Sequence, residues 1–150
     1  MTSLEVHKTV NAPASTVWET ITNLESSPDI IGGIESVEIL TDGPFSVGTR
    51  WRETRTMFGK SSTEEMEVTG VDAGRSYVVE ADGHGVHYRS VMSVVPVDEE
   101  TCTLSMTFAG EPTSTASKFF AATIGKMFEG GTEKALQQDL EDIAVAAQSR

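Results

Sequence analysis

Two kinds of hydrophobic periodicity divide the chain. Before Glu111 most apolar residues alternate with polar ones, a pattern that predicts β-strands. Over residues 113–147 the apolar residues recur at helical spacing instead, and this segment begins with hydroxyl side chains that suit a helix cap. A sheet with one buried face needs a second layer, and this segment alone is long enough to supply it. The pattern therefore predicts an antiparallel sheet packed against one long C-terminal helix.

The predicted helix carries two apolar arcs that do not line up. The first arc holds Phe120, Ile124, Met127, Phe128, Gly131 and Ala135. The second arc is rotated by roughly 120° and holds Leu136, Leu140, Ile143 and Ala147. The change falls at Gly130-Gly131, where each glycine lowers helix propensity by about 1 kcal/mol. We expect a kinked or interrupted helix, with its first half facing a cavity and its second half anchored in the core.

Seven strands are expected, separated by turn-forming sequences such as Asp42-Gly43-Pro44 and Asp82-Gly83. They cover residues 4–10, 34–40, 49–58, 62–71, 77–82, 86–97 and 101–109. A helix is expected between the first two strands. Pro13 suits its first position, and Ser27-Pro28 is expected to end it. One more short turn is expected over residues 29–33. The order is strand, helix, short helix, six strands, long helix.

Length and charge narrow the class of protein. A chain of 150 residues is most simply one domain with one core. The formal net charge of −12 argues against binding to nucleic acid or anionic membranes, which attract basic surfaces. No apolar run approaches the roughly 18 to 20 residues that span a bilayer, and the N-terminal residues do not resemble a signal peptide. We therefore expect a cytosolic protein that is not a membrane protein.

Several short motifs resemble those of a known superfamily. Residues 10–19 read VNAPASTVWE, where a strand ends in a small-residue-proline step and a helix carries a Val-Trp pair. VGTRW at residues 47–51, Pro96 at the end of a long strand, and Asp139-Leu140 in the last helix follow in order. Together they resemble the START-like, polyketide cyclase/dehydrase superfamily (SRPBCC) over essentially the whole chain. Two departures are Ser27-Pro28-Asp29, where members often place an aromatic residue, and Gly130-Gly131.

The resemblance implies an α+β helix-grip fold, in which a curved seven-stranded antiparallel sheet wraps around the long C-terminal helix. Residues 1–150 would then form a single START-like ligand-binding domain with a cavity between sheet and helix. The implied function is binding of an apolar small molecule, either lipid-like or ring-containing like a polyketide. Two alternatives stay open: a polyketide cyclase/dehydratase-type enzyme, and a protein-interaction domain, because fold does not fix function.

Strand alternation predicts which side chains line this cavity. We place Trp51 inward, which brings Glu53, Arg55 and Met57 to the same face. The other expected lining residues of the sheet are Met66, Val68, Tyr77, Val79, Tyr88, Met92, Met106 and Phe108. From the helix we expect Phe120, Ile124, Met127 and Phe128, with Gly131 leaving room for a ligand. The alternatives are that the methionines fill an irregular core and that Gly131 only breaks the helix.

Glu53 and Arg55 are the sharpest candidates for chemistry. Two residues apart on one strand, they share a face at a spacing of about 7 Å. In an enzyme, Glu53 would move a proton while Arg55 or Tyr88 stabilises a developing enolate. The alternatives are a structural ion pair at the sheet rim, or a one-residue error in strand parity that places both side chains in solvent.

The remaining reactive residues do not predict a cofactor or metal site. His7, His84 and His87 are expected at the surface, because their spacing does not converge with acidic or thiolate partners. The single Cys102 excludes an intramolecular disulfide and alternates with Leu104 and Met106, so we expect a buried core thiol. No serine lies in a recognisable nucleophile motif. We therefore expect no cofactor and no metal.

Overall fold

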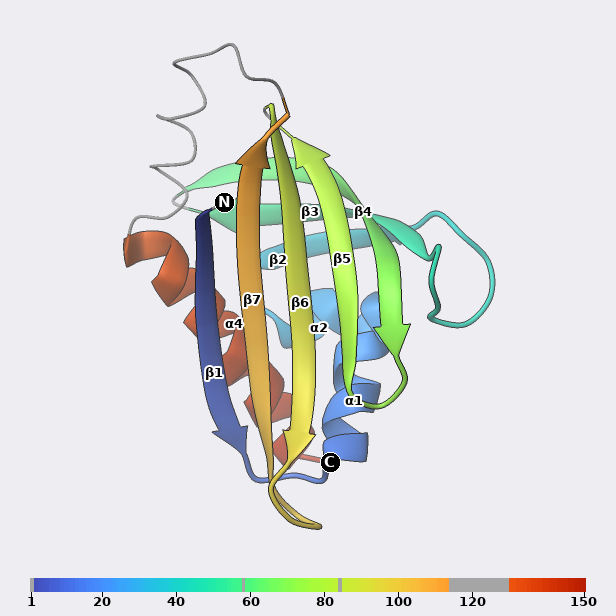
Figure 1. The fold of residues 1–150 in the computed structure, drawn as a ribbon, viewed down its shortest axis with the longest axis vertical. Coiled ribbons are helices and arrows are strands. Elements are labelled where there is room, and N and C mark those ends of the chain that lie inside the picture. Colours follow the sequence, from blue (N-terminus) through green and yellow to red (C-terminus); the bar gives the residue numbers. More distant parts are fainter. Residues whose placement is uncertain (1, 58, 84, 114–129) are drawn as a thin grey trace.

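The computed structural model describes residues 2–57, 59–83, 85–113 and 130–150 (Figure 1). Seven strands form one antiparallel sheet in the order β1-β7-β6-β5-β4-β3-β2. They are β1 Thr2–Val10, β2 Ile34–Ile39, β3 Arg50–Met57, β4 Lys60–Asp72, β5 Ser76–Gly83, β6 Val86–Pro96 and β7 Cys102–Pro112. All seven predicted strands are confirmed. The largest shift is at the end of β7, predicted at residue 109 and found at Pro112, where pairing with Val86 prolongs the strand.

The helices described lie between the first two strands and at the C-terminus. They are α1 Ala14–Thr22, the 3₁₀ turn η1 Leu24–Ser26, α2 Ser27–Ile30 and α4 Gly130–Gln148. The second short helix is present but lies earlier than the expected residues 29–33, because α2 begins at Ser27 and includes Pro28 in its first turn. Proline is tolerated in the first turn of a helix, where its missing N–H costs no hydrogen bond.

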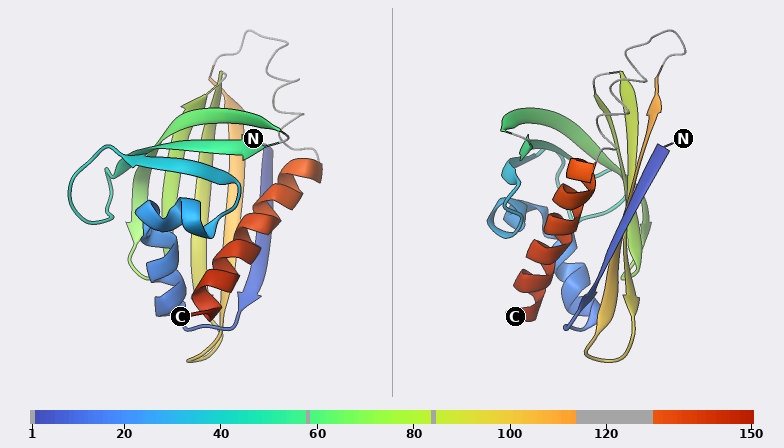
Figure 2. Two further views of the ribbon diagram at one scale, coloured as in Figure 1. Left: turned by 180° about the vertical axis from the view of Figure 1, so that it is seen from behind. Right: turned by 90° about the vertical axis from the view of Figure 1, so that its left-hand side faces the viewer.

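All of these helices lie on one side of the sheet, which curves around α4 (Figure 2). The sheet strands β6 and β7 bury one face, on which Val94 lies with Cys102 and Leu104; the expected burial of Cys102 is confirmed. The second apolar arc of the last helix is also confirmed, since Leu140 and Ile143 are among the most buried residues of the core. This arrangement is the helix-grip fold.

Two of the sequence-based expectations for the long helix cannot be placed within the described residues. The first apolar arc, over residues 120–128, lies outside them. The second is the expected interruption at Gly130-Gly131. Helix α4 is described from Gly130 onward, so both glycines lie in its first described turn and the residues before them are outside the described part. No helix in the described part of the chain is long and apolar enough to cross a membrane.

Candidate ligand-binding site

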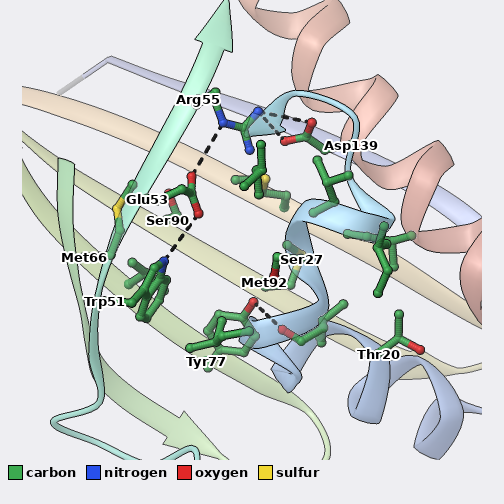
Figure 3. Close-up of a pocket in the computed structure, with 18 residues that line it drawn as sticks. Thr20, Ser27, Trp51, Glu53, Arg55, Met66, Tyr77, Ser90, Met92 and Asp139 are labelled. Atoms are coloured by element: carbon green, nitrogen blue, oxygen red, sulfur yellow. Dashed lines mark hydrogen bonds and ion pairs between the residues drawn. The ribbon is translucent and has the colours of Figure 1, made fainter. Parts of the chain in front are cut away.

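A cavity of about 130 Å³ lies between the curved sheet, the helices after β1 and helix α4 (Figure 3). Its described lining comes from residues that are far apart in the sequence. These residues are Thr20, Ile21, Leu24, Ser27, Ile30, Ile31, Ile34, Trp51, Glu53, Arg55, Met66, Tyr77, Val79, Ser90, Met92, Met106, Asp139 and Ile143. Most are apolar, so the cavity has the composition of a small-molecule site.

Tyr77 forms one aromatic wall of the cavity. Its ring meets Phe45 edge to face at a centroid distance of 4.9 Å and Trp18 at 6.0 Å. Its hydroxyl donates a hydrogen bond to the Ile21 carbonyl oxygen at 3.3 Å, which ties β5 to α1. Burial raises the pKa of this hydroxyl far above its usual range, with a smaller contribution from the charge of Glu53. Tyr77 is therefore a neutral hydrogen-bond donor at physiological pH.

The polar end of the cavity is built from three charged side chains. Arg55 Nη1 lies 3.0 Å from Asp139 Oδ2 and 3.2 Å from Asp139 Oδ1, so α4 and β3 are joined by an ion pair. Arg55 Nε lies 3.6 Å from Glu53 Oε2. Glu53 Oε1 in turn accepts a hydrogen bond from the indole N–H of Trp51 at 3.4 Å. One guanidinium thus faces two carboxylates.

Asp139 is the most buried member of this group, with 8% of its side chain exposed. Burial raises the pKa of its carboxyl to about 6; Arg55 opposes this shift, while Glu53 and Asp142 add to it. Desolvation disfavours the charged form of a carboxylate, and a single guanidinium shared with Glu53 offsets only part of that penalty. Asp139 therefore changes protonation state near neutral pH, as acid–base groups in active sites often do.

Gly33 leaves the space through which Arg55 reaches Asp139. A Cβ at Gly33 would lie 3.3 Å from Arg55 Nη1 and 4.0 Å from Asp139 Oδ1, so a side chain there would crowd the guanidinium. The neighbouring Gly32 N–H donates to Asp142 Oδ2 at 3.0 Å, which holds the α2–β2 segment against α4. Close backbone approach of this kind is a common reason for glycine.

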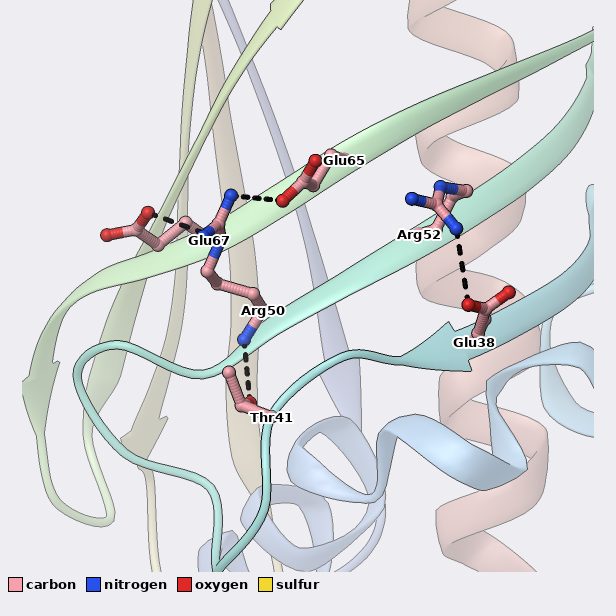
Figure 4. A network of polar contacts seen from close by, with 6 residues as sticks. All are labelled: Glu38, Thr41, Arg50, Arg52, Glu65 and Glu67. Atoms are coloured by element: carbon pink, nitrogen blue, oxygen red, sulfur yellow. Dashed lines mark hydrogen bonds and ion pairs between the residues drawn. The ribbon is translucent and has the colours of Figure 1, made fainter.

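The predicted parity of β3 is correct. Its opposite face carries Arg50 and Arg52, both of which form ion pairs across the outer surface of the sheet (Figure 4). Arg50 pairs with Glu65 and, at 3.8 Å, with Glu67, while Arg52 lies 3.2 Å from Glu38. Glu53 and Arg55 therefore face the cavity instead of solvent, as the Trp51 parity requires.

Of the predicted lining residues, eight are brought together around the cavity: Trp51, Glu53, Arg55, Met66, Tyr77, Val79, Met92 and Met106. Five others are placed by the structure but are not among the described lining residues: Met57, Val68, Tyr88, Phe108 and Gly131. The remaining four, Phe120, Ile124, Met127 and Phe128, lie outside the described residues. Whether any of these residues binds a ligand stays a prediction.

Tyr88 and Phe108 have a different environment from the one expected. They stack on each other at a centroid distance of 5.7 Å, and Tyr88 is buried in a cluster with Ala81 and Val86. Burial, with a smaller effect from Glu64, raises the pKa of Tyr88 to about 12. Strand alternation gave the correct face for both residues, but the strands extend past the cavity, so these two pack beyond it. The role of Tyr88 in enolate stabilisation consequently loses its geometric basis.

Two groups of lining residues were missed by the sequence reasoning. The apolar residues of the α1–β2 connection, including Ile30 and Ile31, gave no signal, because their contact with the cavity depends on long-range packing. Asp139 did carry a signal. It lies three residues after Leu136 and four before Ile143, so an acidic residue occupies the buried arc of the helix. Buried acids usually need a partner, and in the structure that partner is Arg55.

Outside the cavity, the described part of the chain holds one notable histidine. His87 Nε2 lies 2.8 Å from Glu80 Oε1, and its Nδ1 lies 2.7 Å from Asp82 Oδ1, across the β5–β6 ladder. These two contacts, Glu80 first, raise the pKa of the imidazole above its ordinary value. Among the described residues, no three His, Cys, Asp or Glu side chains are grouped so that they could hold a metal ion.

The sequence matches a family model described as polyketide cyclase / dehydrase and lipid transport over residues 1–148. The chain belongs to this polyketide cyclase/dehydrase family. The resemblance drawn from the short motifs is thereby confirmed. A search of curated proteins finds no significant match.

Several solved structures have the same fold as this polyketide cyclase/dehydrase family member. The Zhui aromatase/cyclase from Streptomyces sp. R1128 superposes with a TM-score of 0.84 at 23% identity, covering 99% of this chain and 94% of the other. Norcoclaurine synthase from Thalictrum flavum superposes with a TM-score of 0.75 at 18% identity, covering 99% of this chain and 87% of the other. A START superfamily protein from Mycobacterium smegmatis superposes with a TM-score of 0.69 at 15% identity, covering 94% of this chain and 98% of the other. At these identities the likeness establishes the fold alone.

Proposed function

We propose that residues 1–150 form a single ligand-binding domain that takes up a small, largely apolar, ring-containing molecule in the cavity between sheet and α4. The observation that carries this proposal is the composition of the cavity wall: many apolar side chains and one polar end at Glu53, Arg55 and Asp139. Ligand sites are commonly built from an apolar wall with a few polar groups that fix orientation. The cytosolic location of this binder is a further prediction of the sequence.

The size of the cavity favours a single ring. Its volume is about 130 Å³, and an apolar cavity of about 150 Å³ is known to hold benzene. The aromatic side chains of Trp51 and Tyr77 line the space and offer edges and faces for ring contacts. The methionines Met66, Met92 and Met106 add an adaptable surface, since thioether side chains change rotamer at low cost.

Native mass spectrometry of freshly purified protein would show whether a small molecule is bound. Titration with 2-phenylethanol, followed by calorimetry and thermal unfolding, then tests the cavity itself. We expect Ser90→Leu to weaken binding at least about tenfold, because the added side chain occupies cavity volume. Ser93→Leu is the matched control, since it lies three residues along β6 on the opposite face. Equal affinity in both variants would place the ligand elsewhere.

A second candidate function is a cyclase/dehydratase-type reaction, and one observation favours it. Asp139 has a pKa of about 6 and lies against Arg55 inside the cavity. A carboxyl that titrates near neutral pH is suited to transfer protons, while a guanidinium stabilises charge that develops on an enolate oxygen. In a linear triketone, removal of a proton from the terminal methyl carbon would let that carbon attack the distal carbonyl, with later loss of water.

Heptane-2,4,6-trione tests this candidate, because bond formation between C1 and C6 with loss of one water gives 5-methylbenzene-1,3-diol. We expect the wild-type protein to accelerate formation of this diol over buffer. Asp139→Asn should lower kcat by at least about 100-fold, the usual lower bound for losing a general acid or base. Circular dichroism checks that the variant is folded. A wild-type rate equal to that of buffer would exclude this reaction for the triketone and leave the binding function in place.

A further inference from the structure

The described charges of the cavity do not balance. Within the described lining, the charged side chains are Glu53, Arg55 and Asp139, and these three together carry one surplus negative charge when both carboxylates are ionised. An uncompensated charge with little exposure to water is costly, and a ligand of opposite charge lowers that cost. The surplus charge therefore bears on which ligands the cavity takes up, an inference that rests on the proposed binding function.

Arg55 already lies between two carboxylates, which disfavours an anionic ligand beside it. Its Nη1 faces both oxygens of Asp139 at 3.0 and 3.2 Å, and its Nε points to Glu53 at 3.6 Å. A ligand carboxylate would have to displace Asp139 from the guanidinium or accept a position beside two like charges. Both arrangements leave a carboxylate buried without a full partner, which disfavours acids in this cavity.

Glu53, in contrast, has unused acceptor capacity. Its side chain is 14% exposed, and its contacts with Trp51 Nε1 at 3.4 Å and with Arg55 Nε at 3.6 Å are both long. Strong hydrogen bonds to a carboxylate measure about 2.7 to 2.9 Å, and a carboxylate can accept about four of them. A cationic donor entering the cavity would therefore find a partner at Glu53 without breaking the Arg55–Asp139 pair.

We propose that the cavity selects small ring-containing amines, whose ammonium group donates to Glu53 beside the indole of Trp51 while the ring occupies the apolar wall. The indole face adds a cation–π contribution to any ammonium within about 6 Å of the ring. The neutral alcohol of the same shape retains the ring contacts and loses the charge interaction. The corresponding acid adds repulsion from Glu53 and Asp139.

A matched set of ligands tests this selectivity: 2-phenylethylamine, 2-phenylethanol and 3-phenylpropanoate, titrated calorimetrically at about pH 7.5. This pH lies above the pKa of about 6 at Asp139 and below the usual pKa of a primary ammonium group. We expect the amine to bind at least about tenfold tighter than the alcohol, and the acid at least about tenfold more weakly than the alcohol. Added salt should lower the affinity for the amine more than the affinity for the alcohol. An alcohol that binds as tightly as the amine would overturn the proposal while leaving the binding function intact. Failure of all three ligands to bind would remove the binding function for single-ring ligands and the proposal with it.

Variants of Glu53 and of a control residue test whether Glu53 determines the preference for the amine. In Glu53→Gln the ratio of amine to alcohol affinity should fall toward one. Glu141→Gln removes the same charge from the exposed face of α4, where Glu141 pairs with Lys8, and should keep the wild-type ratio. An unchanged ratio in Glu53→Gln would overturn the assignment. The ranking of the three ligands on the wild-type protein decides the proposal even if that variant does not fold.

Discussion

Arg55 on β3 and Asp139 on α4 lie 84 residues apart in the sequence and meet in an ion pair of 3.0 Å. This contact joins the strand layer to the helix layer at the polar end of the cavity. It also sets the protonation of Asp139, because the guanidinium lowers a pKa that burial raises. The stability of the fold and the protonation state of Asp139 are therefore coupled through one pair of side chains.

The pH dependence of stability should reveal the buried carboxyl of Asp139. Its pKa is about 6 in the folded protein and 3.8 ordinarily, so the folded state holds this proton more tightly. The resulting stabilisation is fully present below about pH 4 and is lost as pH rises through about 6, a change on the order of 3 kcal/mol. The free energy of unfolding of the wild type, minus that of Asp139→Asn, should therefore fall between these pH values. Chemical denaturation at several pH values measures it, and a difference independent of pH would contradict the shift.

Gly33 should be the more sensitive of the two adjacent glycines. In Gly33→Ala the new Cβ lies 3.3 Å from Arg55 Nη1, so the guanidinium must move and its contact with Asp139 weakens. Because Arg55 lowers the pKa of Asp139, this variant should raise that pKa further, as measured by NMR titration of the carboxyl carbon. Gly32→Ala is the control, since its Cβ would meet Asp142 at an ordinary 3.7 Å. Identical titration curves for both variants would show that Gly33 does not position Arg55.

His87 should titrate above its ordinary pKa of 6.5, chiefly because of Glu80 and then Asp82. A raised pKa in the folded state means that the protonated imidazole contributes stability below pH 6.5, which is lost as pH rises through the folded value. We expect Glu80→Gln to bring the His87 pKa back toward its ordinary value in an NMR titration. Glu38→Gln changes the same charge near Arg52 and serves as the control. An unaltered His87 titration in Glu80→Gln would contradict the assigned cause.

Truncating Leu140 should lower the stability of the protein more than truncating most other residues of α4. It is fully buried between the helix and the sheet, so Leu140→Ala should lower the free energy of unfolding by about 2 to 5 kcal/mol. Val145 lies on the same helix and is 55% exposed, so Val145→Ala should change stability by less than about 0.5 kcal/mol. Denaturant titrations of both variants measure the contrast. Similar losses would mean that the second apolar arc is not the anchor of the helix.

The sheet could be predicted in nearly complete form because alternation and turn residues are local signals. The choice of Trp51 as an inward residue fixed the faces of Glu53 and Arg55, since side chains along a strand alternate with period two. The face of a residue, however, does not determine its position along the sheet. Tyr88 and Phe108 have the predicted orientation and still pack beyond the cavity.

The site was less predictable, because its members meet only through tertiary packing. Ile30 is the last residue of α2 and Ile31 follows it, and a helix of only 4 residues gives no periodic signal. Asp139 interrupts an otherwise apolar arc, and its partner lies on a distant strand, so the sequence marks the residue without naming what it contacts. Charge balance in the cavity emerges only once Glu53, Arg55 and Asp139 are seen together (Figure 3).

The strand order has a consequence for how this chain is made. Strand β1 pairs with β7, with Thr2 opposite Gly110 and Val10 opposite Cys102, whereas the strands β2 to β7 follow one another as neighbours. On the ribosome, the first strand therefore waits until β7, the strand with which it pairs in the described part of the chain, has emerged. Contacts between residues so distant in the sequence slow folding. The nascent chain thus exposes an unpaired strand for most of its synthesis, and such an edge favours association with other chains.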